Sequence, residues 1–186
     1  MSKYLDRAKE IRAIVEPHHN CAQSVLMSFT QSLNLDDETA FKIATAFGGG
    51  MKSGITCGVI TGGLMVLGLF DVDAPEDTQA LVKYFQSRHS DMLNCADLLK
   101  ANAAAGGTRK PHCDALVYEM VEYVEKVLKE KRKILDGCVF SYSNNYYQLL
   151  DENGVIVKIF KGTDITVMKD IFDHTIRAEY RKKVYS

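Results

Sequence analysis

Cysteines are the residues with the clearest capacity for chemistry in this chain, which has five in 186 residues. Four of them each follow a turn or loop and stand where a helix is expected to begin: Cys21, Cys57, Cys95 and Cys113. A thiol in the first turn of a helix lies near unpaired backbone N–H groups and the positive end of the helix dipole, which favour the reactive thiolate. The fifth, Cys138, lies in a β-rich segment, where we expect a small buried side chain. The four recurring positions therefore predict thiol chemistry.

The segment around Cys57 combines a glycine-rich loop with an apolar run, AFGGGMKSGITCGVITGGLMVLGLF, over residues 46–70. Glycine lacks Cβ, so the backbone can bend with positive φ and neighbouring segments can approach closely. We expect Cys57 to be the nucleophilic thiolate, activated by its helix terminus and by backbone N–H groups of the loop. Gly49, Gly50 and Gly58 are the residues expected to approach a bound cofactor. The loop does not fit a phosphate loop, because Met51 rather than glycine stands directly before Lys52 and the preceding segment is expected to be helical and not a strand.

Four thiols are compatible with two kinds of site. In a thiol–disulfide redox site, one of Cys21, Cys95 or Cys113 would resolve an intermediate on Cys57 by forming a disulfide. In a metal site, all four would be thiolate ligands of zinc or of an iron–sulfur cluster. The sequence has no CxxC pair to support the metal site, so thiol redox chemistry is the function that we expect, and the residues do not say whether it uses a cofactor. Such a protein would be a thiol-based oxidoreductase, and its residues do not identify the redox partner.

Composition is that of an ordinary globular protein, with 46% hydrophobic and 25% charged residues. The formal net charge of −1 gives no electrostatic reason to expect a nucleic acid or an anionic membrane as partner. The longest apolar run, residues 55–70, is shorter than a membrane-spanning helix and is interrupted by glycines. The first residues show no apolar signal segment with a cleavage site, so we expect a cytoplasmic protein.

Helical periodicity covers most of the chain up to residue 134. We expect helices at 4–16, 21–33, 36–47, 56–69, 75–90, 95–100 and 113–133. Asn20 and Thr56 are expected to cap the second and fourth of these helices, and Pro75 suits the first turn of the fifth. Gly58 and Gly62 are four residues apart, so we expect them to form a groove in which another helix packs closely.

Composition changes after residue 134. The segments 138–142, 146–151 and 155–160 are β-rich, Asn153-Gly154 is typical of a two-residue hairpin turn, and a last helix is expected to end near residue 178. The expected fold class is therefore mainly α, a helical bundle with a small C-terminal β-hairpin plus a helix. We expect two domains, a helical cysteine-motif domain at 1–134 and an appendage at 135–186. Edge pairing of the β-rich segments would allow a homodimer.

The cysteine motifs match a known pattern. The runs NCAQSVLMSF, AFGGGMKSGITCGVITGGLMVLGL and NCADLL, followed by a cysteine at the next expected helix start, resemble the C_GCAxxG_C_C family of redox-active proteins. The resemblance covers about residues 14–124. It assigns the first family cysteine to Cys21, the central motif to Cys57, Gly58 and Gly62, and the last two cysteines to Cys95 and Cys113. It implies redox-active cysteines, and brings neither a substrate nor an established cofactor.

Overall fold

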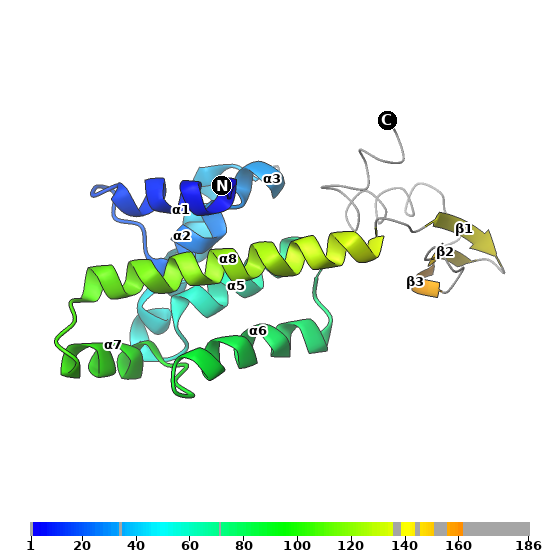
Figure 1. The fold of residues 1–186 in the computed structure, drawn as a ribbon. Coiled ribbons are helices and arrows are strands. Elements are labelled where there is room, and N and C mark those ends of the chain that lie inside the picture. The colour runs from blue at the N-terminus through cyan, green and yellow to red at the C-terminus, as the bar shows by residue number, and fades with distance from the viewer. Residues whose placement is uncertain are drawn as a thin grey trace. The chain divides into compact units, whose positions relative to one another are not determined.

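The computed structural model describes residues 2–33, 35–70, 72–135, 139–143, 146–150 and 156–161, with side chains described as far as residue 130 (Figure 1). Its chain forms two compact units, Met1–Glu125 and Lys126–Ser186. The predicted domain boundary between residues 134 and 135 stays a prediction. All four motif cysteines belong to the first unit.

The first unit is built from helices. These are α1 (Lys3–Ala13), α2 (Cys21–Met27), α3 (Thr30–Leu33), α4 (Asp37–Ala44), α5 (Gly58–Leu69), α6 (Pro75–Arg88), α7 (Cys95–Ala104) and the start of α8 (Arg109–Leu135). The short turns η1 (Thr45–Phe47) and η2 (Gly50–Gly54) connect α4 to α5. In Figure 1, α1 and α2 lie on one side of the first turns of α8, and α6 and α7 lie on the other. The helical part of the predicted fold class is therefore confirmed.

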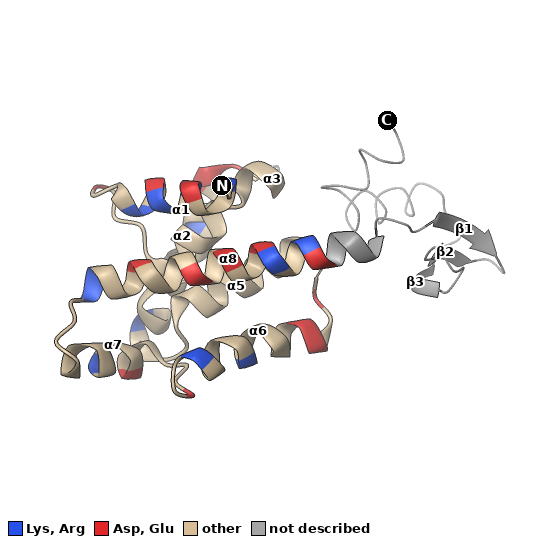
Figure 2. Ribbon diagram, in the orientation of Figure 1, with Lys and Arg blue, Asp and Glu red and all other residues tan. Residues whose placement is uncertain are grey.

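The central helix of this unit is α5. It carries no charged side chain, whereas α1, α6 and α8 carry both signs of charge (Figure 2). A Cβ atom built on Gly62 would lie 2.9 Å from the Cβ of Val25, and one on Gly58 would lie 3.2 Å from the backbone nitrogen of Ala22. The predicted glycine groove is confirmed, and α2 is the helix that occupies it. Among the described residues, no helix has both the length and the hydrophobicity that crossing a bilayer requires.

Local signals at two helix starts are confirmed. The side chain of Asn20 accepts a hydrogen bond from the backbone nitrogen of Gln23 at 3.0 Å, and the Gln23 side chain accepts one from the backbone of Asn20 at 2.8 Å. This reciprocal pair is a capping box, and it fixes the start of α2 at Cys21. Pro75 occupies the first position of α6, where its missing N–H costs nothing.

The last helix of this unit begins earlier than predicted. We expected a helix from residue 113, but α8 begins at Arg109 and includes Pro111 in its first turn. Proline is compatible with the first turn of a helix, because the N–H groups there have no partner within the helix. Cys113 therefore lies in the second turn of α8 and not at its start.

The predicted small C-terminal β-hairpin is wrong. Where side chains are described, residues 2–130 contain no strand beyond an isolated bridge between Thr56 and Asn94. The described residues after the end of α8 form a three-stranded antiparallel sheet in the order β1 (Val139–Ser143), β2 (Tyr146–Leu150) and β3 (Ile156–Lys161). In this sheet the middle strand β2 has a hydrogen-bonded partner on each side. In a two-stranded hairpin, each strand would keep one side without a partner. Cys138, Asn153-Gly154 and the predicted last helix lie outside the described residues.

Candidate functional site

Backbone pairing brings Cys57 and Cys95 together before their helices begin. Thr56 and Asn94 form an isolated antiparallel bridge. The N–H of Cys57 donates to the carbonyl oxygen of Leu93, and the N–H of Cys95 donates to the carbonyl oxygen of Ile55, both at 2.8 Å. Cys57 becomes the N-cap of α5 and Cys95 the first residue of α7, so Thr56 is not the cap that we predicted. The two thiols are hydrogen-bonded to each other, and we call them the inner pair.

A second pair is formed by Cys21 and Cys113, whose side chains are also hydrogen-bonded to each other. We call them the outer pair, because both are partly exposed, whereas Cys57 and Cys95 are 3% and 8% exposed. Cys21 is the first residue of α2, directly after the capping box. Three of the four predicted site cysteines thus stand at helix starts and Cys113 lies in the second turn of α8, and the four meet as two pairs.

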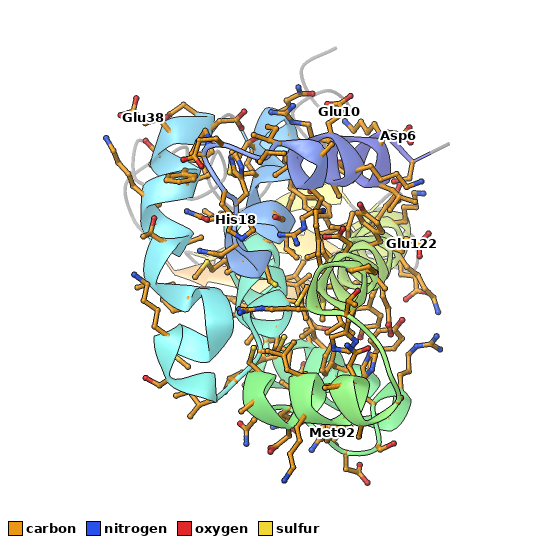
Figure 3. The ribbon with its side chains drawn as sticks, turned by 90° about the vertical axis from the view of Figure 1, so that its left-hand side faces the viewer. Asp6, Glu10, His18, Glu38, Met92 and Glu122 are labelled. Atoms are coloured by element: carbon orange, nitrogen blue, oxygen red, sulfur yellow. The ribbon has the colours of Figure 1, made fainter. Side chains whose placement is uncertain are left out.

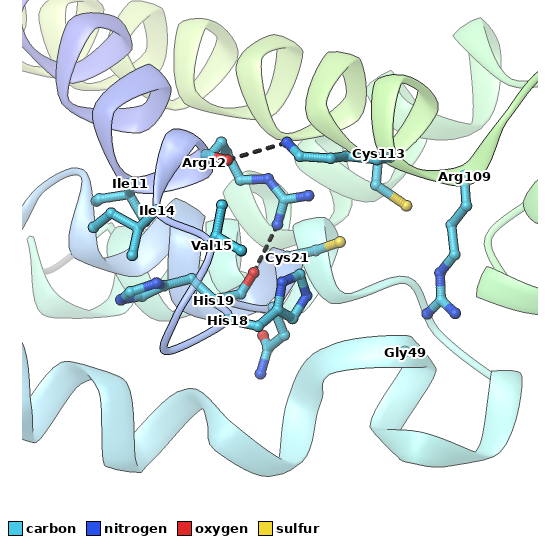
Figure 4. A pocket seen from close by; sticks show the side chains of 12 residues that line it. Ile11, Arg12, Ile14, Val15, His18, His19, Cys21, Gly49, Arg109 and Cys113 are labelled. Atoms are coloured by element: carbon cyan, nitrogen blue, oxygen red, sulfur yellow. Dashed lines mark hydrogen bonds between the residues drawn. The ribbon is translucent and has the colours of Figure 1, made fainter.

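The outer pair lines a pocket of about 640 Å³ (Figure 4). The other lining residues come from the end of α1, the turn after it, the glycine loop and the first turn of α8: Ile11, Arg12, Ile14, Val15, His18, His19, Asn20, Gly49, Arg109 and Lys110. In Figure 4 the sulfur atoms of Cys21 and Cys113 lie near each other, and the side chain of Arg109 extends toward Gly49. The described lining residues include the Arg and Lys side chains of Arg12, Arg109 and Lys110, and none of them is Asp or Glu.

Electrostatics separate the two thiols of the outer pair. The hydrogen bond from Cys21 lowers the pKa of Cys113 to about 6, and the guanidinium groups of Arg109 and Arg12 act in the same direction against burial. The pKa of Cys21 is raised well above its ordinary value, first by the hydrogen bond with Cys113 and then by burial. At neutral pH, Cys113 is therefore the thiolate and Cys21 is the thiol that donates to it.

The inner pair has the same asymmetry. The hydrogen bond from Cys57 lowers the pKa of Cys95 to about 7, with a smaller contribution from Arg109. The pKa of Cys57 is raised, first by the hydrogen bond with Cys95 and then by burial, although the backbone amide of Val59 acts in the opposite direction. These directions favour Cys95 as the thiolate of this pair. The predicted role of Cys57 as the nucleophile stays a prediction.

A buried arginine at the wall of the pocket joins α1 to α8. Arg12 is 6% exposed. Its Nε donates to Oδ1 of Asp114 at 2.6 Å, and its Nη1 donates to the backbone oxygen of His19 at 2.7 Å. Lys110 donates to Oδ2 of the same aspartate at 2.8 Å and to the backbone oxygen of Arg12 at 3.1 Å. This network fixes the turn after α1 against the helix that carries Cys113.

The glycines predicted to approach a cofactor have different positions. Gly49 lines the pocket with a φ of +62°. Gly50 has a φ of +63°, and a Cβ there would lie 2.3 Å from the backbone oxygen of Ile55. The two residues that follow it also have positive φ, so the loop makes a left-handed turn. Gly58 lies against α2 in the groove described above. Only the first of the three thus contributes to the pocket within the part of the chain that is described.

The predicted metal alternative has no support in the geometry of the described residues. They contain no group of three or more His, Cys, Asp or Glu side chains that could hold a metal ion. The four cysteines lie as two hydrogen-bonded pairs, whereas a tetrahedral zinc site needs four ligands converging on one point. Zinc or an iron–sulfur cluster stays a prediction for elemental analysis.

Sequence reasoning did not find the cations of the pocket. Arg12 belongs to α1, and its partner Asp114 lies 102 positions further along the chain, so no local pattern connects them. Arg109 and Lys110 do stand shortly before Cys113, and basic residues within one turn of a cysteine are a signal of a lowered thiol pKa. That signal was present in the sequence.

Comparison with known families agrees with this site. A family model described as "Putative redox-active protein (C_GCAxxG_C_C)" matches residues 19–127, which is more than half of the chain. All four paired cysteines and both pocket residues from the start of α8 lie within the matched segment. The comparisons with curated proteins and with solved structures found no match.

Proposed function

Because the chain belongs to the C_GCAxxG_C_C family, whose description is redox activity, we propose that it carries out thiol–disulfide exchange at the outer pair. One observation carries the proposal. Cys113 and Cys21 are hydrogen-bonded to each other at the wall of a pocket, and the pKa of Cys113 is lowered while that of Cys21 is raised. A stable thiolate beside a protonated thiol is the arrangement that a nucleophile and its resolving cysteine need.

In the proposed reaction, the thiolate of Cys113 attacks one sulfur of an external disulfide. The external S–S bond breaks, a mixed disulfide forms at Cys113, and one thiolate leaves. Cys21 then loses its proton to that thiolate and attacks the sulfur of Cys113, which releases the second half of the substrate. Two electrons have passed from the outer pair to the substrate. The products are an internal disulfide, one external thiol and one external thiolate.

The inner pair would restore the outer pair. Cys57 and Cys95 are too buried to meet a large substrate directly, but Cys95 interacts electrostatically with both cysteines of the outer pair. Attack by the Cys95 thiolate on the outer disulfide, followed by attack of Cys57 on Cys95, passes two electrons to the outer pair and leaves the inner disulfide. An external dithiol then reduces the inner pair. In this scheme Cys57 is the resolving cysteine.

Disulfide mapping tests the proposal. The reduced protein is treated with less than one equivalent of bis(2-hydroxyethyl) disulfide, quenched with acid and analysed by peptide mass spectrometry. We expect the disulfides Cys21–Cys113 and Cys57–Cys95, a stable mixed disulfide on Cys113 in the Cys21→Ser variant, and no mixed disulfide at the pocket in Cys113→Ser. The Cys138→Ser variant is the matched control and should react as the unmodified protein does. Modification of Cys57 alone, or of none of the four, would reject the assignment.

A further inference from the structure

We infer that the pocket at the outer pair accepts a small disulfide that carries a negatively charged group, and that Arg109 binds this group. The inference rests on the proposed exchange at Cys113 and adds the chemical class of its substrate. It is carried by the charges of the pocket, by the position of Arg109 and by the size and apolar wall of the cavity.

The charges of the pocket are unbalanced. Arg12, Arg109 and Lys110 line it, and no Asp or Glu is among its described lining residues. Asp114, directly beside the pocket, is shared by Arg12 and Lys110 at 2.6 and 2.8 Å. Figure 3 shows the described side chains around the helices and labels His18, one of the pocket-lining residues of the turn after α1. One carboxylate thus serves two of the three cations.

Arg109 is the cation that remains. Among the described residues it forms no ion pair with a carboxylate, and its interactions are with the thiols of Cys113 and Cys95. The thiolate of Cys113 provides a counter-charge before the reaction. Attack on a disulfide removes that negative charge, because the sulfur of Cys113 becomes part of a neutral mixed disulfide. A carboxylate or phosphate on the substrate would replace it at the guanidinium group, which binds such anions with two parallel hydrogen bonds.

The dimensions of the pocket suit a small molecule. Its volume of about 640 Å³ lies within the range of ordinary ligand pockets, which combine apolar walls with a few polar groups. Ile11, Ile14 and Val15 supply the apolar wall, and Val15 is 82% exposed. A substrate whose charged group contacts Arg109 can therefore place its carbon chain on the wall and its disulfide at Cys113.

Three small disulfides of similar size test the inference on the reduced, full-length protein. These are 3,3′-dithiodipropionate, which is anionic, bis(2-hydroxyethyl) disulfide, which is neutral, and cystamine, which is cationic. Each rate of outer-pair oxidation is divided by the rate with the neutral disulfide in the same variant, because Arg109 also lowers the pKa of Cys113. We expect the anionic compound to react at least about fivefold faster than the cationic one at low salt, with the ratio falling as salt is added.

Two substitutions of exposed residues separate the local effect from net charge. Arg109→Gln should reduce the ratio to about one, while Lys83→Gln, which removes the same charge from an exposed residue of α6 that does not line the pocket, should leave it unchanged. An equal ratio in both variants, or no preference in the unmodified protein, overturns the inference. Oxidation by the neutral disulfide would still support the proposed function, and its absence would overturn that function instead.

Added inorganic phosphate, at constant ionic strength, distinguishes the two sources of the anion. Selective slowing of the anionic disulfide would mean that phosphate also binds at the site, so that the charged group of the substrate can be a phosphate. If added phosphate does not slow the anionic disulfide and Arg109→Gln removes the preference for it, the site is assigned to carboxylates.

Discussion

The acidity of Cys113 makes a quantitative prediction for the pH dependence of its reaction. Its pKa is lowered from the ordinary 9.0 to about 6, first by the hydrogen bond from Cys21. Replacing Cys21 with alanine removes this hydrogen bond, so the pKa of Cys113 should rise toward its ordinary value. Because a lowered pKa means that the thiolate persists at lower pH, the unmodified protein should keep its reactivity down to about pH 6 and lose it below that pH.

The size of the effect follows from two opposing factors. At pH 6 about half of Cys113 is thiolate, against about 0.1% of a thiol of ordinary pKa, which is roughly a 500-fold difference. A thiolate of lower pKa is also a weaker nucleophile, and three pKa units cost roughly 20-fold at a Brønsted coefficient of about 0.45. The net expectation is a reaction roughly 25-fold faster than that of an ordinary thiol at pH 6, and roughly tenfold slower at pH 9.

The assay is the rate at which the free thiol of Cys113 is lost on reaction with bis(2-hydroxyethyl) disulfide between pH 5 and 9, located by peptide mass spectrometry, because this loss is seen whether or not Cys21 resolves the mixed disulfide. Cys57→Ala/Cys95→Ala/Cys138→Ser is the background, so that only the outer pair reacts. Within it, Cys21→Ala should be slower at pH 6 and faster at pH 9, and far-ultraviolet circular dichroism checks that the fold is retained. A midpoint at or above pH 8 in the background protein would refute the reasoning, as would profiles that do not change when Cys21 is removed.

Three further predictions concern stability and composition. Arg12→Met leaves Asp114 partly buried with one of its two cations removed, and it should lower the free energy of unfolding by about 2–4 kcal/mol in urea titrations. Lys42→Met, which removes one partner of an exposed ion pair, should change the free energy of unfolding by less than about 0.5 kcal/mol. Equal effects of the two substitutions would contradict the network around Arg12. Gly62→Ala should destabilise by about 1–3 kcal/mol because its Cβ would meet α2, and Gly68→Ala, with open space around its Cβ, should be neutral or stabilise by up to about 1 kcal/mol. Elemental analysis of protein purified without air should find no stoichiometric zinc or iron, and one metal ion per chain would revive the metal alternative.

Local interactions explain what the sequence could predict. The capping box at Asn20 and the proline at the start of α6 act within one helical turn, so the residues alone determine them. The glycine groove was predictable because spacing of four places both glycines on one face of α5. The start of α8 was predicted four residues too late, because Pro111 is compatible both with the end of a loop and with the first turn of a helix.

The arrangement of the thiols was not predictable in the same way. The sequence identified all four cysteines but left their pairing open, because pairing depends on contacts between helices that are distant in the chain. The bridge between Thr56 and Asn94 is a single pair of residues with no strand pattern around it, so periodicity could not reveal it. The pKa directions depend in turn on that pairing, which is why the structure favours Cys95 and Cys113 as thiolates.

The bridge between Thr56 and Asn94 also has a consequence for the energetics of the redox cycle. Closing a disulfide between distant residues normally costs the entropy of closing the intervening loop. Here the backbone hydrogen bonds on both sides of the bridge have already closed that loop in the reduced protein. The effective molarity of Cys57 toward Cys95 is therefore set by side-chain rotation alone, and such preorganisation favours the oxidised form. The reduced outer pair is in addition stabilised by the lower pKa of Cys113, about 6 against about 7 for Cys95, so the inner pair should be the more reducing of the two and electrons should flow outward from it to the pocket.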